Sequence, residues 1–262
     1  MVRLIASDMD GTLLDENAHL PEETFELVLK LKGQGIRFVA ASGRRYDTLR
    51  AFFGPIADQI DYVASNGAQV YADGKLLSRD VFGCGALRRL KSVVGAFDNM
   101  HLVVHDATRC FLLENGAFYT PEIDKDLPNP VEIPDLPDPE IDLIKVCIYC
   151  DDNPMDCSYV LSRELGNDYV FAPSGHQWID VMQRGVNKAS GLQQVLDARG
   201  ISANDAMVFG DSMNDYEMFR LAGQSIAMWN ARYALRQVAT RTIGRNADYA
   251  VQQELAKLLN AQ

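Results

Sequence analysis

Short apolar runs alternate with helix-like segments at both ends of this 262-residue chain. In the first third, apolar runs at residues 2–7, 36–41 and 62–65 are separated by helix-like stretches at 21–32 and 46–53. In the last third, helix-like stretches at 188–198 and 213–221 flank further runs at 206–209 and 225–228. Such β-α-β alternation is typical of a parallel sheet with helices on its faces. We therefore expect an α/β fold with a doubly wound parallel sheet.

The middle of the chain has a different composition. Most of the excess negative charge lies between Cys84 and Arg184, and an acidic, proline-rich stretch runs from Pro121 to Pro139. Proline cannot donate to a sheet ladder, so this stretch is predicted to be a solvated loop without regular structure. We expect a β-hairpin turning at Asp73-Gly74 before this region. The predicted domains are 1–83 and 185–262 for one α/β core, with 84–184 inserted as an α/β cap.

Charge and composition exclude several functions. The net charge of −11 argues against nucleic acid and anionic membrane surfaces as partners. No run approaches the ~20 apolar residues of a membrane span, and no signal-peptide pattern begins the chain. The odd number of cysteines, five, predicts free thiols and a cytoplasmic location. Cys147 and Cys150 fall in a predicted strand, where residues three apart face opposite sides, which argues against a shared metal.

Polar side chains follow four of the predicted strands or open the next helix. In a parallel α/β sheet, ligands bind beyond the carboxyl ends of the strands, so these side chains should converge. They are Asp8 and Asp10; Ser42, Gly43 and Arg44; Lys188; and Asp211, Asn214 and Asp215.

The residue types at this edge have both structural and functional interpretations. Asp8 and Asp10 could belong to a turn, but two carboxylates on alternate positions repel each other unless a cation lies between them. Ser42 could cap a helix, bind an anion, or do both. Asp211 could be an ordinary first-turn acid. Lys188 opposes the dipole of the helix that it begins, so we expect Lys188→Ala to lose activity and keep its fold.

Four ordered motifs resemble those of the haloacid dehalogenase superfamily of phosphatases, in its Cof-like branch with a large α/β cap (type IIB). They are "DMDGTLL" from Asp8, "ASGR" ending at Arg44, "NK" at Asn187 and Lys188, and "GDSMND" ending at Asp215. "SNGA" from Ser65 and "IAMWNA" from Ile226 also fall where the branch has similar segments. The resemblance implies a Rossmann-like core and Mg²⁺-dependent hydrolysis of small phosphomonoesters.

By this resemblance, Asp8 attacks the phosphoryl group and becomes an aspartyl-phosphate, while Asp10 protonates the leaving alcohol and then activates water. The implied phosphate ligands are Ser42, the Gly43 amide, Lys188 and Asn214. The implied metal ligands are Asp8, the Asp10 carbonyl and Asp211, with Asp215 supporting the metal or Lys188. An anionic nucleophile needs positive charge to approach an anionic phosphoryl group, which agrees with these roles.

Substrate choice is less constrained. Sugar phosphates are the expected class, and candidate substrate residues are Arg44, Arg45, Asn66 and His176. Trp229 replaces a usual glycine, and the segment after Asp248 lacks an acidic run common in the branch. The alternatives are a phosphosugar mutase of the same superfamily, a non-enzymatic aspartate phosphoacceptor, and a catalytically silent binding protein.

Overall fold

A computed structural model describes residues 1–113, 127, 129–174 and 177–260. The chain divides into two compact units, one formed by Met1–Arg79 with Asn187–Gln262, and the other by Asp80–Val186. The sequence analysis predicted an insertion at 84–184, and the second compact unit spans Asp80–Val186. Each unit has its own sheet and its own apolar core.

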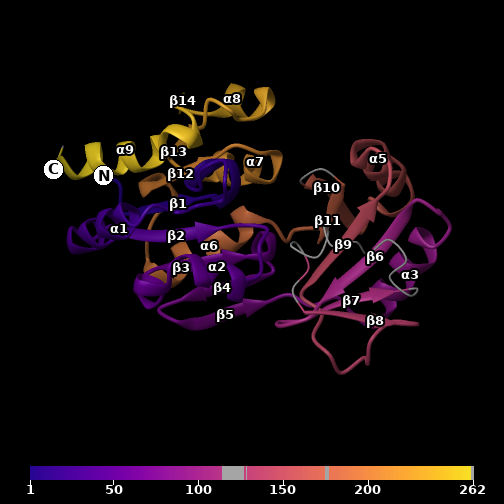
Figure 1. Cartoon of the computed structure of the whole chain (residues 1–262). Helices are drawn as coiled ribbons and strands as arrows, with labels where there is room; N and C mark the ends of the chain where they lie inside the picture. Colours follow the sequence, from indigo (N-terminus) through magenta and orange to yellow (C-terminus); the bar gives the residue numbers. More distant parts are fainter. Residues whose placement is uncertain (114–126, 128, 175–176, 261–262) are drawn as a thin grey trace. The chain divides into compact units, whose positions relative to one another are not determined.

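The first unit contains an eight-stranded sheet in the order β14-β13-β12-β1-β2-β3-β4-β5 (Figure 1). The strands from β14 to β3 are parallel, and β4 and β5 form an antiparallel hairpin at one edge. Asp73 and Gly74 have positive φ angles of 50° and 70° in the hairpin turn, as the Asp-Gly pair predicted. The strands are β1 (Leu4–Ser7), β2 (Arg37–Ala41), β3 (Asp61–Ala64), β4 (Gln69–Ala72), β5 (Lys75–Arg79), β12 (Ala206–Gly210), β13 (Gln224–Ala227) and β14 (Arg241–Thr242).

The helices of this unit follow the predicted alternation. They are α1 (Glu23–Gly33), α2 (Tyr46–Phe52), α6 (Lys188–Arg199), α7 (Tyr216–Leu221), α8 (Tyr233–Val238) and α9 (Ala250–Asn260). The predicted helix 213–221 is divided, because a 3₁₀ turn, Met213–Asp215, precedes α7. At the start of α6, Asn187 accepts a hydrogen bond from the Ser190 amide, and Gly200 ends the helix with a φ of 60°.

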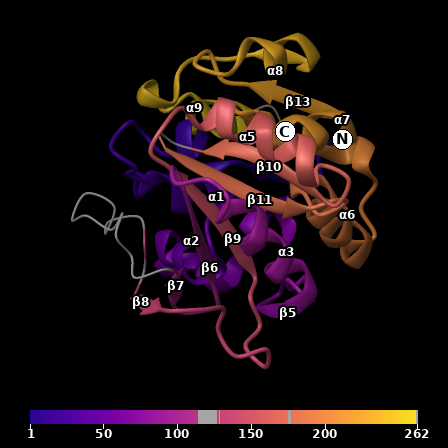
Figure 2. The ribbon, with the colours of Figure 1, turned by 90° about the vertical axis from the view of Figure 1, so that its right-hand side faces the viewer.

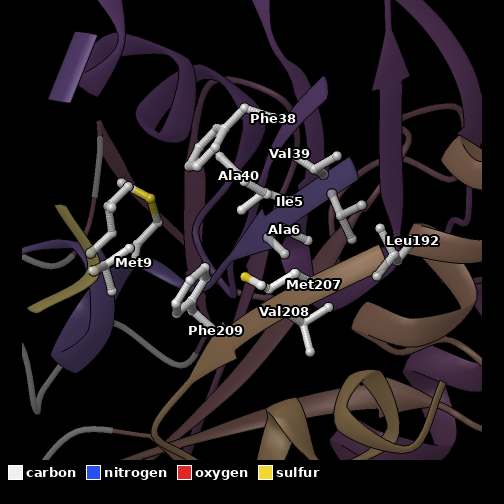
Figure 3. Packing of buried hydrophobic residues seen from close by; sticks show 14 of the residues in the cluster. Ile5, Ala6, Met9, Phe38, Val39, Ala40, Leu192, Met207, Val208 and Phe209 are labelled. Carbon is white, nitrogen blue, oxygen red and sulfur yellow. The ribbon is translucent and has the colours of Figure 1, made fainter. Parts of the chain in front are cut away.

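The core of the first unit lies on both faces of its sheet. Figure 3 shows Phe38 and Phe209 on one side of the central strands, and Val39 and Val208 on the other side with Leu192 of α6. Successive strand residues point to opposite faces, so these buried pairs place apolar side chains in both layers. The doubly wound α/β class expected from the sequence is confirmed.

The second unit contains a six-stranded sheet in the order β10-β11-β9-β6-β7-β8 (Figure 2). Its pairs are antiparallel except for β7 with β8. The elements are α3 (Cys84–Val94), β6 (Met100–His105), β7 (Cys110–Leu113), β8 (Pro130–Ile133), β9 (Lys145–Cys150), α5 (Pro154–Leu165), β10 (Tyr169–Ser174) and β11 (Trp178–Gln183). Helices α3 and α5 contribute Leu87, Leu90 and Leu161 to its core.

One sequence prediction for this unit is wrong. The proline-rich stretch was expected to lack regular structure, but β8 lies within it. Pro130 is the first residue of this edge strand, a position at which the missing N–H is tolerated. The part of the stretch at residues 121–126 and 128 is outside the described residues.

The cysteines agree with the sequence analysis. All five are free. Cys147 Sγ lies 3.4 Å from the Asp180 Oδ1 atom, whereas Cys150 belongs to the apolar core with Cys157. The two thiols of β9 therefore face different environments.

Candidate active site

The loop after β1 begins with a buried carboxylate. Asp8 directly follows the strand, and residues 9–13 form a tight, irregular turn in which Gly11 has a φ of 77°. A Cβ atom at Gly11 would lie 2.5 Å from the Oδ2 atom of Asp211. Glycine is therefore required for two reasons, the left-handed backbone and the close approach of the loop after β12.

Three carboxylates from adjacent strand ends form a cluster. Asp8, Asp211 and Asp215 offer oxygen atoms that all lie within 4.8 Å of one another. This proximity follows from the parallel pairing of β1 with β12, which brings the carboxyl ends of both strands to one edge of the sheet. Thr12 Oγ1 donates a hydrogen bond of 3.4 Å to Asp211 Oδ1.

Lys188 lies against this cluster and is fully buried. Its Nζ atom is 2.5 Å from Asp8 Oδ1 and 2.7 Å from Asp215 Oδ1. Burial works against the charge of the ammonium group, but Asp215 and Asp8 more than offset it and raise the pKa of Lys188. The lysine is therefore held protonated between two carboxylates.

Asp215 is held by protein donors on both oxygen atoms. Its Oδ2 atom accepts hydrogen bonds from the amides of Asp211 and Ser212 at 3.0 and 3.1 Å, while Oδ1 accepts from Lys188. Gly210 makes room for this side chain, because a Cβ atom there would lie 2.6 Å from the Asp215 carboxyl carbon. The arrangement suits a side chain that orients its neighbours.

The cluster carries more negative than positive charge. Burial, and then the charge of Asp215, raise the pKa of Asp211 to about 7. Burial also raises the pKa of Asp8, although Lys188 opposes the shift. Lys188 forms ion pairs with two of the three carboxylates, Asp8 and Asp215. A bound cation would relieve the remaining repulsion.

Asp10 lies apart from the carboxylate cluster in its side-chain contacts. Its carboxylate accepts two hydrogen bonds from Arg44, from Nε at 2.8 Å and from Nη2 at 2.6 Å. Arg44 follows β2, the strand next to β1. Of the two predicted acids in the first motif, only Asp8 has its carboxylate in the cluster.

The other predicted phosphate and substrate residues are mostly buried. Ser42 lies just after β2, and its Oγ atom accepts a hydrogen bond of 3.1 Å from the Arg44 amide. Asn214 Nδ2 donates to Asn66 Oδ1 at 3.0 Å, which joins two predicted site residues from distant parts of the sequence. Arg45 is buried and pairs with Asp47, so its guanidinium does not point into solvent. Gly43 lies between Ser42 and Arg44, and His176 is outside the described residues.

Side chains near the C-terminus hold the loop that carries Asp8, and the sequence analysis assigned them no role. Asn230 donates to the Gly11 carbonyl at 2.8 Å, Asn246 to the Leu14 carbonyl at 2.9 Å, and Gln252 to the Leu13 carbonyl at 3.0 Å. The signal for Asn230 was present in the "IAMWNA" segment, but its target could not be read from the sequence. These bonds fix the loop from the C-terminal side.

Trp229, in the same segment, is exposed, and the Arg236 guanidinium lies 5.6 Å from the centre of its ring. The indole therefore packs on the surface of the unit, where the resemblance would have placed a glycine.

Comparisons with known proteins find matches along almost the whole chain. The family model of haloacid dehalogenase-like hydrolases matches residues 5–255. The chain is 33% identical over 271 residues to the 5-amino-6-(5-phospho-D-ribitylamino)uracil phosphatase YbjI of Escherichia coli (strain K12), covering 98% of this chain and 96% of the relative. The structure of SMU.1108c from Streptococcus mutans UA159 has a TM-score of 0.91 at 23% identity, covering 99% of this chain and 100% of that one. The subclass IIB sugar phosphatase BT4131 has a TM-score of 0.82 at 16% identity, covering 98% and 99%.

Proposed function

The chain belongs to the haloacid dehalogenase-like hydrolases and is a phosphoric monoester hydrolase, and on that premise we propose that it is a Mg²⁺-dependent phosphatase of sugar phosphates that acts through an aspartyl-phosphate. The observation that carries the proposal is the buried contact of Lys188 with Asp8 beside Asp211. A buried lysine beside a carboxylate cluster can receive a phosphoryl group. A purely structural ion pair would not require such a cluster.

The residues present fit a magnesium ion. Asp8 and Asp211 are neighbouring carboxylates with raised pKa values, and Asn214 has a buried amide oxygen that accepts no hydrogen bond from a described residue. Mg²⁺ prefers oxygen ligands and commonly uses one or two carboxylates together with a substrate phosphate. Asp8, Asp211 and the Asp10 carbonyl would hold the ion. When bound, it would neutralise charge on the phosphoryl oxygens and on the nucleophile.

In the first step that we propose, an oxygen of Asp8 attacks phosphorus. The bond from phosphorus to the alcohol oxygen breaks, its electron pair stays on that oxygen, and Asp10 supplies the proton. Lys188 stays protonated and offsets the charge of the nucleophile and of the transferring group. Ser42, the Gly43 amide and Asn214 would hold phosphoryl oxygens.

In the second step, water attacks the aspartyl-phosphate. Asp10, now a carboxylate, accepts the proton of the water as the bond between phosphorus and Asp8 breaks, which regenerates both side chains. Asp215 keeps Lys188 in place through both steps, because its two oxygens are already fixed by the Lys188 ammonium and two backbone amides.

The substrate class rests on the relatives. The relative YbjI acts, by its name, on a phosphorylated ribityl compound. We propose phosphorylated sugars or sugar alcohols as substrates.

Phosphate release from a panel of sugar phosphates, pyridoxal phosphate and flavin mononucleotide tests the function, with Mg²⁺ and again with chelator. We expect repeated turnover that requires the metal in the wild type and no turnover in Asp8→Asn. Asp197→Asn, an exposed acid on α6, serves as a matched control and should keep full activity. No release by folded wild-type protein, or turnover by Asp8→Asn near that of the wild type, would contradict the proposal.

A further inference from the structure

A two-point ion pair joins the ends of β1 and β2. Both oxygen atoms of Asp10 accept hydrogen bonds from one guanidinium, at 2.8 Å from Arg44 Nε and 2.6 Å from Arg44 Nη2. The Asp10 side chain is 52% exposed, so packing contributes little to its orientation. A planar guanidinium that binds both carboxylate oxygens sets the distance and also the plane of the carboxyl group.

Arg44 is itself held in place. Its amide donates to Ser42 Oγ at 3.1 Å, and its carbonyl accepts from the Ser65 amide at 2.8 Å. Its guanidinium carbon lies 5.1 Å from the centre of the Phe52 ring, within the range of a cation–π contact. Arg44 is therefore held by hydrogen bonds of its backbone and by the contact of its guanidinium with an aromatic ring.

We infer that Arg44 is a positioning residue, which acts through Asp10 by fixing the direction of its carboxyl group for proton transfer to the leaving alcohol. This inference rests on the proposed function and assigns Arg44 a different role from the substrate contact expected from the sequence. Asp10 lies two residues from Asp8, so a freely rotating carboxylate could turn toward any cation held there and away from the alcohol. The two hydrogen bonds from the Arg44 guanidinium prevent this rotation of the carboxylate.

Leaving groups that differ in their need for a proton distinguish an Arg44 that positions Asp10 from an Arg44 that contacts the substrate. A nitrophenolate leaves readily without protonation, whereas a sugar alkoxide needs an acid, and a general acid contributes roughly 10²- to 10⁴-fold. In Arg44→Ala, we expect kcat/KM for a sugar phosphate to fall roughly tenfold or more because the acid is misplaced. For 4-nitrophenyl phosphate we expect kcat/KM to change less than about threefold. The ratio kcat/KM reports the steps up to departure of the leaving group, so it excludes the later attack of water, in which Asp10 serves both substrates.

A double-mutant cycle with Asp10→Asn makes the test specific. If Arg44 acts only through Asp10, Arg44→Ala adds no further loss on the sugar phosphate once Asp10 is asparagine. Arg44→Lys keeps the charge but not the fork, so its activity should lie between those of Arg44→Ala and the wild type. Arg50→Ala is the matched control, because it removes another arginine–aspartate pair, with Asp58, from the neighbouring helix α2.

Equal losses of kcat/KM on both substrates would overturn the inference, because they would mean that Arg44 acts on the phosphoryl group and not through the acid. Fully additive losses in the double variant would also overturn it. Either result leaves the phosphatase itself intact, since the wild type and Arg50→Ala would still turn over both substrates. Failure of the wild type on both substrates would instead refute the proposed function.

Discussion

Replacing Lys188 by methionine removes the ammonium group that pairs with Asp8 and Asp215, while keeping a side chain of similar length. Lys188 and Asp215 are fully buried and Asp8 is nearly so, so the variant leaves two carboxylates in the interior without their partner. Breaking a buried ion pair on one side costs about 3 to 5 kcal/mol. From the sequence we expected a variant of Lys188 to keep its fold; from these buried contacts we expect it to lose stability as well.

The expected shift is large enough to measure by thermal unfolding. At roughly 2 to 4 °C per kcal/mol for a chain of this size, the unfolding midpoint in chelator falls by roughly 6 to 20 °C. Lys30→Met is the matched control, because Lys30 is exposed and its i,i+4 pair with Glu26 contributes about 0.5 kcal/mol or less.

A second variant tests the cause of the shift. Adding Asp215→Asn to Lys188→Met removes one of the two buried carboxylates that have lost their partner, so the double variant should recover part of the lost stability. Mg²⁺ should also raise the unfolding midpoint of Lys188→Met, since a bound cation can offset the negative charge of the carboxylates. A midpoint for Lys188→Met within about 2 °C of the wild type in chelator would refute the argument from buried charge.

Three further predictions concern the metal, the pH and the backbone. Mg²⁺ at 100 times its Kd should stabilise the wild type by about 2.7 kcal/mol, and Asp211→Asn should lose most of this in a thermal-shift titration; an equal gain in both would exclude Asp211 as a ligand. The pKa of Asp73 is lowered to about 2, chiefly by its hydrogen bond from Arg199, so Asp73→Asn should be less stable than the wild type above about pH 4, with the difference vanishing as the pH falls toward 2 in urea unfolding. Gly11→Ala should lose more stability and more Mg²⁺ affinity than Gly35→Ala. Both glycines have positive φ, but of the two only Gly11 would place a Cβ atom against another side chain, at 2.5 Å. Equal effects of the two substitutions would mean that this close approach adds no cost.

Local patterns predicted most of the core unit, because most of its strands are short apolar runs and helix α6 has clear start and stop signals. Asn187 and Gly200, for example, mark both ends of α6. The patterns also predicted which strand ends would lie together, since parallel strands share an edge. The two-residue strand β14 and the edge strand β8 carry too little apolar sequence to stand out.

The contacts between loops could not be predicted in the same way. Arg44 meets Asp10 across 34 positions, and Asn246 meets Leu14 across 232. Side-chain bonds over such separations depend on the exact path of each loop and leave no periodic signal. The chemical roles of Asp8, Asp10 and Lys188 remain predictions that the kinetic experiments test.

The junction between the inserted unit and α6 has a consequence for how such chains can be recombined. Asn187 caps the helix with its side chain, and its carbonyl leaves no space for a Cβ atom at Gly67, so the point where the chain re-enters the core is tightly fitted. Lys188 is the next residue. An engineered exchange of residues 80–186 for a different insert should therefore leave the position of Lys188 unchanged, provided that the exchange ends before Asn187 and Gly67 is kept.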